Sequence, residues 1–121
     1  MNSTPLEKEE QIAFVEYCKA KGIRVVSTQN GFKMPKAGFN YVAYSNSLKK
    51  MGLSKGFPDL IVFAKNSQSD ILFIEMKRKK GGVLQEEQKE WLQWLDENGY
   101  TVAVAKGADS AIQILEKYLT L

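Results

Sequence analysis

The spacing of apolar and polar positions in the first quarter of the chain predicts a helix followed by a strand. Apolar side chains recur at helical spacing over residues 6–21, and Gly22 ends the pattern. Thr4 is the expected N-cap, with Glu7 three residues later completing a capping box. Residues 23–28 are rich in β-branched side chains, which favours a strand.

The centre of the chain predicts a short helix and then a hairpin of two strands. Ser45 or Asn46 is a candidate N-cap for a short helix that ends near Gly52. Two apolar runs follow, at residues 56–64 and 71–77, and a short polar segment separates them. This is the pattern of two adjacent strands joined by a tight loop.

The last third of the chain predicts a helix, a strand and a second helix. An apolar stripe over residues 84–98 predicts a helix that ends at Gly99. Residues 100–105 are almost wholly apolar, the pattern of a strand covered on both faces, and a helix is expected over residues 109–119. The order of elements predicts an α/β fold with a single mixed sheet flanked by helices, in one domain spanning residues 1–121.

Composition narrows the chemistry that this fold can carry. The chain of 121 residues has 44% hydrophobic residues, enough for one core. It contains no histidine, which excludes Ser-His-Asp triads, histidine-bound metals and histidine general bases. The single cysteine, Cys18, lies in an apolar helical pattern and is expected to be a buried thiol. Carboxylate, lysine and metal chemistry remain.

Charge and hydropathy indicate which partners and which cellular location to expect. A net charge of +3 with an isoelectric point near 8.9 permits a polyanionic partner without requiring one. The N-terminus has no apolar signal segment, and no apolar run approaches the length of a membrane span. We therefore expect a cytoplasmic location.

Three charged residues stand on the two central apolar strands. Side chains alternate along a strand, so Glu75 and Lys77 share one face while Met76 points to the other. Asp59 follows Pro58 at the start of the partner strand, and hairpin pairing brings it near Glu75. Two carboxylates at close range repel unless a proton or a cation lies between them, and Mg²⁺ suits such a pair.

These residues resemble a nuclease signature. Asp59, Glu75 and Lys77 resemble the PD-(D/E)xK motif of the restriction-endonuclease-like nucleases. The Gly-Phe-Pro-Asp lead-in to Asp59, the strand around Glu75, and the downstream Gln88 and Trp91 resemble more narrowly the VRR-NUC family. That family includes small stand-alone phage and bacterial proteins and the nuclease domain of the Fanconi-associated nuclease. The resemblance implies a restriction-endonuclease-like core.

The resemblance also implies hydrolysis of DNA phosphodiesters with Mg²⁺ or Mn²⁺. Asp59, Glu75 and the backbone carbonyl of Met76 would hold the ion, together with an acid from the first helix, directly or through water. We assign that acid to Glu10 rather than Glu7, because the expected capping box already employs Glu7. A boundary carboxylate that reaches solvent is the other interpretation of Glu10.

Two further residues receive catalytic roles from the same resemblance. Lys77 would position the attacking water and supply positive charge. Gln88 lies on the inward stripe of its predicted helix, one turn before Trp91. It would orient water or phosphate near the ion, or serve as a satisfied boundary amide.

Polar and basic residues on the flanking segments are the candidate DNA contacts. Those assigned to DNA are Asn30, Lys33, Lys49, Lys50, Lys55, Arg78, Lys79 and Lys80. A phosphate backbone would relieve the repulsion among the consecutive cations at 77–80. A solvated basic face around Lys49 and a charged strand end that blocks edge pairing are the alternatives.

The substrate expected from the resemblance is branched DNA. Stand-alone VRR-NUC proteins resemble Holliday-junction resolvases, which act as homodimers because a four-way junction presents two equivalent strands. The sequence therefore predicts a dimeric, phage-type or bacterial nuclease of the DNA-repair class. A flap-type or non-specific nuclease and a catalytically inert DNA-binding module are the alternatives.

Overall fold

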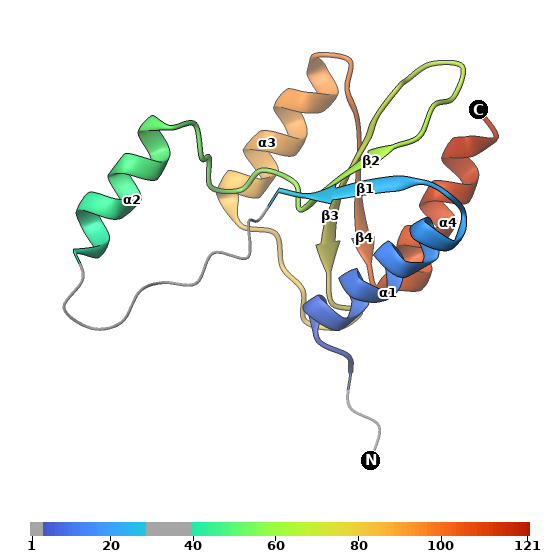
Figure 1. Cartoon of the computed structure of the whole chain (residues 1–121), viewed down its shortest axis with the longest axis horizontal. Coiled ribbons are helices and arrows are strands. Elements are labelled where there is room, and N and C mark those ends of the chain that lie inside the picture. The colour runs from blue at the N-terminus through green and yellow to red at the C-terminus, as the bar shows by residue number, and fades with distance from the viewer. Residues whose placement is uncertain (1–3, 29–39) are drawn as a thin grey trace.

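The chain folds into one four-stranded mixed sheet with helices on both faces (Figure 1). The computed structural model describes residues 4–28 and 40–121. Its elements, in chain order, are α1 (Glu7–Ala20), β1 (Arg24–Ser27), α2 (Tyr41–Lys50), β2 (Leu60–Phe63), β3 (Leu72–Lys77), α3 (Glu86–Glu97), β4 (Thr101–Lys106) and α4 (Ala108–Leu119). The predicted α/β class and order of elements are confirmed.

The sheet combines an antiparallel hairpin with a parallel crossover. Its strand order is β1-β2-β3-β4, with β2 antiparallel to both β1 and β3, and β3 parallel to β4. Helix α3 makes the crossover from β3 to β4. Leu60 pairs with Ile74, so Asp59, one residue earlier, stands opposite Glu75.

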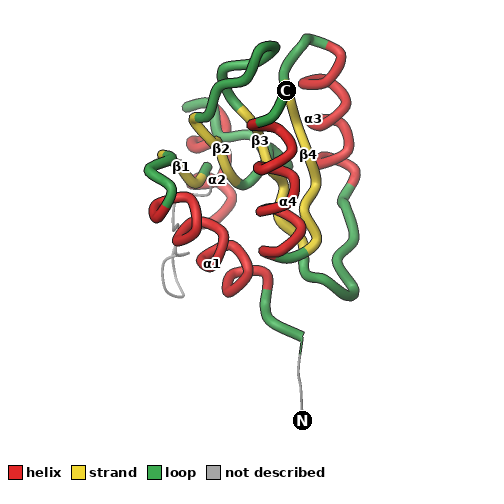
Figure 2. The backbone as a smooth tube through the Cα atoms, turned by 90° about the vertical axis from the view of Figure 1, so that its right-hand side faces the viewer, coloured by secondary structure: helices red, strands yellow, loops and turns green. Residues whose placement is uncertain are grey.

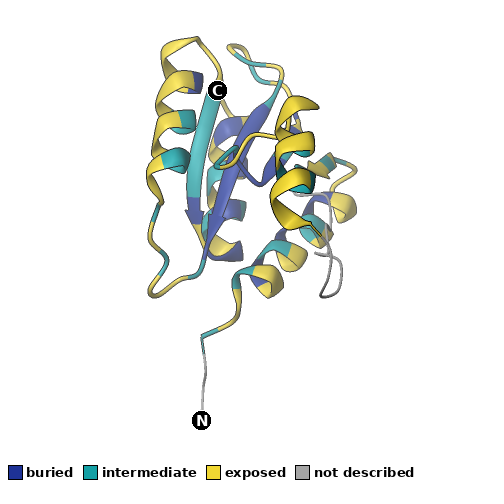
Figure 3. Ribbon diagram, turned by 90° about the vertical axis from the view of Figure 1, so that its left-hand side faces the viewer, coloured by how far each residue is buried: buried dark blue, intermediate teal, exposed yellow. Residues whose placement is uncertain are grey.

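The main core lies between the sheet and the pair of helices α1 and α4 (Figure 2). Leu72, Ile74 and Met76 of β3 point into it, and the thiol of Cys18 is buried there as expected. The alternate β3 residues point to the face that α3 covers. Every residue of β3 is buried, as the dark strand in Figure 3 shows. Charged residues on the α3 face of β3 are therefore held away from bulk solvent.

Strand β4 has α4 packed on one face and α3 on the other, but its side chains keep some exposure. Only Ala105 is buried, and the four preceding residues are half-buried. The predicted cover on both faces is confirmed, and the partial exposure arises because β4 is the last strand in the sheet order and one of its edges has no strand neighbour.

Helix α1 does not begin with the predicted capping box. Leu6 is the N-cap residue, and the Glu9 carboxylate accepts a hydrogen bond of 2.8 Å from the Leu6 N–H. Arg78 donates to the carbonyls of Thr4 and Pro5, which fixes this segment ahead of the helix. Glu7 is consequently free of the capping role that the sequence assigned to it.

Helix α2 also begins earlier than predicted. Asn40 caps it and accepts from the Ala43 N–H at 3.0 Å, so Ser45 and Asn46 lie inside the helix. The helix ends at Lys50, near Gly52 as expected. None of its residues is buried, and it stands away from the sheet (Figure 1).

Within the part of the chain that the structure describes, we find no helix with both the length and the apolar character needed to span a bilayer.

Candidate active site

Asp59, Glu75 and Lys77 converge at the junction of β2 and β3. Their residues are only 2%, 1% and 7% exposed. Asp59 Oδ2 accepts from the Met76 N–H at 2.8 Å, and Lys77 Nζ lies 3.7 Å from Glu75 Oε2. The Thr28 N–H donates to the Asp59 carbonyl at 2.8 Å, which ties the end of β1 to the same point. The convergence predicted from the hairpin register is therefore present in the structure.

Gln88 links the acid and the amine of this site. Its Nε2 donates to Glu75 Oε2 at 2.9 Å, and its Oε1 accepts from Lys77 Nζ at 3.0 Å. The same Oε1 accepts from the Gln85 N–H at 2.8 Å, so Gln88 also caps α3. Both ends of the amide are thereby fixed in orientation, and Lys77 is held as a cation facing the carboxylates.

The two strand carboxylates share an electrostatically costly position. Burial raises the pKa of Glu75 to about 8, and the nearby charge of Asp59 adds to the effect. Burial also raises the pKa of Asp59, although the Met76 N–H opposes that shift. Glu75 Oε1 is buried and receives no hydrogen bond from the described residues. A proton or a cation between the two carboxylates removes this cost.

The residues present fit a Mg²⁺ or Mn²⁺ ion. Within residues 4–28 and 40–121, no group of three or more acidic, histidine or cysteine side chains is arranged to hold a metal ion. Mg²⁺ is usually held by one or two carboxylates, with water and substrate phosphate oxygens completing its octahedron. The buried Asp59–Glu75 pair, with its unpartnered oxygen, meets that requirement.

The acid of α1 that interacts with this pair is Glu7. Burial and the charge of Asp59 raise the pKa of Glu7, and Glu7 in turn raises the pKa of Glu75. The reason for preferring Glu10 was the Thr4–Glu7 capping box, which does not form. Glu7 is therefore the acid of α1 whose charge acts on the Asp59–Glu75 pair.

Glu10 occupies a different place. Its Oε1 accepts from the Ala108 N–H at 3.3 Å, at the first residue of α4. Gly107 packs against the Glu10 carboxylate, since a Cβ at Gly107 would stand 2.6 Å from Glu10 Oε2. A buried carboxylate at a helix N-terminus interacts favourably with the helix dipole. This contact accounts for Oε1 of Glu10, whereas its Oε2 is buried and receives no hydrogen bond from the described residues.

Among the predicted DNA contacts, Arg78 has a structural partner. Its guanidinium donates to the Thr4 carbonyl at 3.0 Å and to the Pro5 carbonyl at 3.2 Å. It therefore links the end of β3 to the entry of α1, and the structure does not present it as a free cation for DNA. The cause is a contact between residues more than seventy positions apart.

The remaining predicted contacts are distributed over two regions. Lys79 pairs with Asp109 at 3.6 Å, and Lys80 is exposed beside it. Lys55 pairs with Glu87 at 3.6 Å, while Lys49 and Lys50 are exposed at the end of α2. The other two predicted contacts, Asn30 and Lys33, lie outside the described residues.

Lys106 lies beside Lys77 at the end of the sheet. Lys106 ends β4 and pairs in register with Lys77, so the two side chains leave the same face of the sheet. Lys106 is exposed, whereas Lys77 is buried. Lys106 falls between the strand predicted over residues 100–105 and the helix predicted over 109–119, and the parallel pairing of β3 with β4 that places it here is not encoded locally.

Comparisons with known proteins agree with this arrangement. The model of the VRR-NUC domain matches residues 39–109, which include Asp59, Glu75, Lys77 and Gln88. A solved structure described as a VRR_NUC domain protein has a TM-score of 0.72 and 27% sequence identity, covering 99% of this chain and 93% of its own. A second, described as a VRR_NUC domain, has a TM-score of 0.59 and 20% identity, covering 93% of this chain and 96% of its own. A search of curated proteins gave no match.

Proposed function

Because the chain belongs to the VRR-NUC family of PD-(D/E)xK nucleases, we propose that it is a metal-dependent endonuclease that hydrolyses phosphodiester bonds in DNA. The observation that carries the proposal is the buried Asp59–Glu75 pair beside an amine that Gln88 holds in place. A protein with no cation or substrate to bind there would gain nothing from so costly a cluster.

The proposed ion site consists of Asp59, Glu75 and the Met76 carbonyl, with the acid of α1 acting directly or through water. Glu7 is the first choice for that acid, and Glu10 the second. When bound, Mg²⁺ or Mn²⁺ supplies a water of lowered pKa and positive charge against the phosphate oxygens. Burial of the two strand carboxylates keeps bulk water away from their oxygens.

Lys77 is the proposed group that positions the attacking water. Gln88 Oε1 takes one donor of the Lys77 ammonium, which has three, and the ion pair with Glu75 turns the ammonium toward the carboxylates. A remaining donor is free to bind the attacking water or a phosphate oxygen. The positive charge also stabilises the charge that develops on the phosphate.

The proposed backbone contacts surround this centre. Lys106 and Lys80 lie at the same end of the sheet as Lys77, and each can neutralise a phosphate. Lys49, Lys50 and Lys55 form a second basic group at the end of α2, and Asn30 and Lys33 remain candidates from the sequence.

A four-way junction cut by a homodimer is the substrate and assembly that we propose first. The support is the resemblance of stand-alone VRR-NUC proteins to Holliday-junction resolvases, whose two-fold symmetry matches two equivalent strands. A flap-type or non-specific nuclease is the second candidate, and an inert DNA-binding module the third. A cytoplasmic role in DNA repair, in bacteria or phage, accords with such a substrate.

The test is a cleavage assay on a four-way junction, 5′ and 3′ flaps and a linear duplex, with Mg²⁺, Mn²⁺, Ca²⁺ or chelator. We expect Asp59→Asn, Glu75→Gln and Lys77→Met each to lower the rate by about 10²–10³-fold, and the exposed control Asp96→Asn to leave it unchanged. Wild-type rates in all three site variants would overturn the mechanism. DNA binding without cleavage under every metal condition would favour the inert module.

The same assay, together with the oligomeric state, separates the nuclease candidates. Paired symmetric incisions in a junction, with a dimer in analytical ultracentrifugation, are expected for a resolvase. Preferential cutting of flaps by a monomer would instead establish the flap-type activity.

A further inference from the structure

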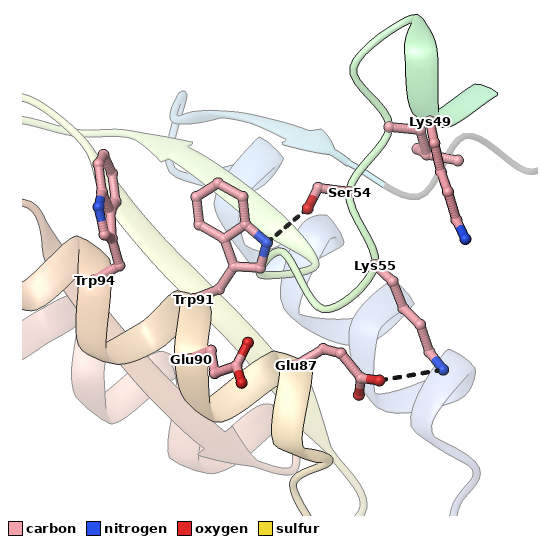
Figure 4. Close-up of a pocket in the computed structure, with 8 residues that line it drawn as sticks. Lys49, Ser54, Lys55, Glu87, Glu90, Trp91 and Trp94 are labelled. Atoms are coloured by element: carbon pink, nitrogen blue, oxygen red, sulfur yellow. Dashed lines mark hydrogen bonds and ion pairs between the residues drawn. The ribbon is translucent and has the colours of Figure 1, made fainter. Parts of the chain in front are cut away.

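A groove lies between α3 and the segment that follows α2 (Figure 4). Its volume is about 590 Å³, within the range of ligand-binding pockets. Trp91 and Trp94 of α3 line one wall, and Leu53, Ser54 and Lys55 line the other. None of the roles proposed above for the chemical step uses the two tryptophans.

The wall formed by Trp91 and Trp94 is held in place by contacts and is partly exposed to solvent. Trp91 Nε1 donates to Ser54 Oγ at 2.9 Å, and the Trp91 ring meets Phe57 edge-on with centroids 4.9 Å apart. Trp94 packs edge-on against Trp91, stacks one face on Tyr100 with centroids 6.3 Å apart, and is still 50% exposed. Exposed indole faces on a rigid support are the surfaces on which unpaired bases stack.

The charges of the groove favour bases over a continuous duplex backbone. Lys49 and Lys55 are balanced by Glu87 and Glu90, and Lys55 pairs with Glu87 at 3.6 Å. A lining with no net charge gains little from neutralising a row of phosphates. Stacking on Trp94 must then supply most of the affinity, with Lys49 available to one phosphate.

Both walls of the groove continue into the candidate active site. Glu87 is followed directly by Gln88, which bonds to Glu75 and Lys77. Lys55 precedes Asp59 by four residues on the other wall. A strand whose phosphodiester lies at Asp59 and Glu75 therefore reaches the groove within a short distance along either wall.

We propose that this groove binds unpaired nucleotides of the DNA substrate, beside the bond that is cut. The inference rests on the proposed nuclease function and narrows its substrate class to DNA that carries single-stranded or unstacked nucleotides at a branch. A fully paired duplex cannot place a base on Trp94 without first being opened.

The two tryptophans of the chain both line the groove, so intrinsic fluorescence reports directly on its occupancy. We would titrate the full chain in Ca²⁺ with a thymidine oligonucleotide, and separately with a duplex, while following binding by the anisotropy of a label on the DNA. The expected result is strong quenching by the single strand and little change with the duplex.

Three variants test whether Trp94 is the surface on which the single strand stacks. Trp94→Ala should raise the single-strand Kd about tenfold and leave the duplex Kd within about twofold, because one stacking surface is lost. Trp94→Phe should recover most of the affinity, because it keeps an aromatic face. Leu119→Ala, an exposed apolar residue of α4, is the control and should change neither Kd.

Two outcomes of the titration would overturn the inference. One is unchanged fluorescence when anisotropy shows the single strand to be saturating. The other is a fluorescence change that depends on protein concentration without DNA, because a second copy of the chain would then fill the groove. Quenching by single strands in a protein that cleaves no DNA would support the groove and overturn the nuclease proposal alone. If Trp94→Ala cleaves each substrate at the same rate as wild type, the role of the groove is overturned and the nuclease proposal stands.

Discussion

Gly56 packs directly on the backbone of Glu87: a Cβ at Gly56 would lie 2.5 Å from the Glu87 carbonyl carbon. Gly56 also has a φ of +92°, where residues with a side chain are strained. Because Glu87 immediately precedes Gln88, this contact sets how closely the start of α3 approaches the strand carboxylates. The glycine of the Gly-Phe-Pro-Asp segment thus positions a residue of the site from across the fold.

Gly56→Ala should therefore impair both stability and cleavage. Gly22→Ala is the matched control, since Gly22 has a φ of +75° and a Cβ there would meet nothing within 4 Å. We expect a loss of about 1–2 kcal/mol of unfolding free energy at Gly22 from backbone strain alone. The loss at Gly56 should be larger, with slower cleavage as well, as measured by urea unfolding and the junction assay. Equal effects of the two substitutions would contradict the positioning role.

Gln88→Glu tests the amide that links Glu75 and Lys77. The substitution keeps an oxygen for the Gln85 N–H and for Lys77, but it replaces the N–H that donates to Glu75 with a negative oxygen. Cleavage should fall by about 10–100-fold, as for other groups that orient the residues of a metal site. Gln113→Glu, on the exposed side of α4, is the control. An unchanged rate would show that Gln88 only caps α3.

Glu7→Gln and Glu10→Gln separate the two acids of α1. Glu7 interacts with Asp59 and Glu75, so its change should raise the Mg²⁺ concentration needed for half-maximal cleavage and leave stability almost unaltered. Glu10 accepts from the Ala108 N–H, so its change should cost about 1 kcal/mol of stability with little effect on the Mg²⁺ requirement. The reverse pattern would restore Glu10 as the ion's ligand.

The sequence predicts those parts of the site that depend on local periodicity. Alternation along β3 places Glu75 and Lys77 on one face. The hairpin register then places Asp59 opposite Glu75. Long-range contacts decide the rest. Arg78 bonds to the Thr4 and Pro5 carbonyls ahead of α1, whose N-cap is Leu6 rather than Thr4, and no local pattern indicates this contact. Lys106 lies beside Lys77 only through the parallel pairing of β3 with β4.

The stability of the metal-free protein should depend on pH through Glu75. Its pKa is raised from 4.5 to about 8, so the folded state binds this proton more tightly than the unfolded chain. The stabilisation from the proton is complete below about pH 4.5 and is lost as the pH rises through about 8. In chelator, the unfolding free energy should therefore fall over this window in wild type, and less steeply in Glu75→Gln.

Mg²⁺ provides the control for that measurement. A bound cation takes the place of the proton between Asp59 and Glu75, so saturating Mg²⁺ should flatten the wild-type profile and raise the melting temperature at about pH 8. Identical pH profiles of the unfolding free energy for wild type and Glu75→Gln in chelator would show that the carboxylate pair does not bind this proton in the folded state.

Lys106→Ala tests whether the strand partner of Lys77 contacts the DNA backbone. Lys106 is exposed, leaves the same face of the sheet as Lys77, and ends the strand beside the candidate site. A single phosphate contact carries no sequence information, so its loss should weaken binding to every DNA equally and lower the salt dependence of log Kd by about one unit. Lys117→Ala on α4 removes the same charge elsewhere and should change the salt dependence less. Fluorescence anisotropy in Ca²⁺ at several salt concentrations gives both slopes, and equal slopes for the two variants would mean that only net charge matters.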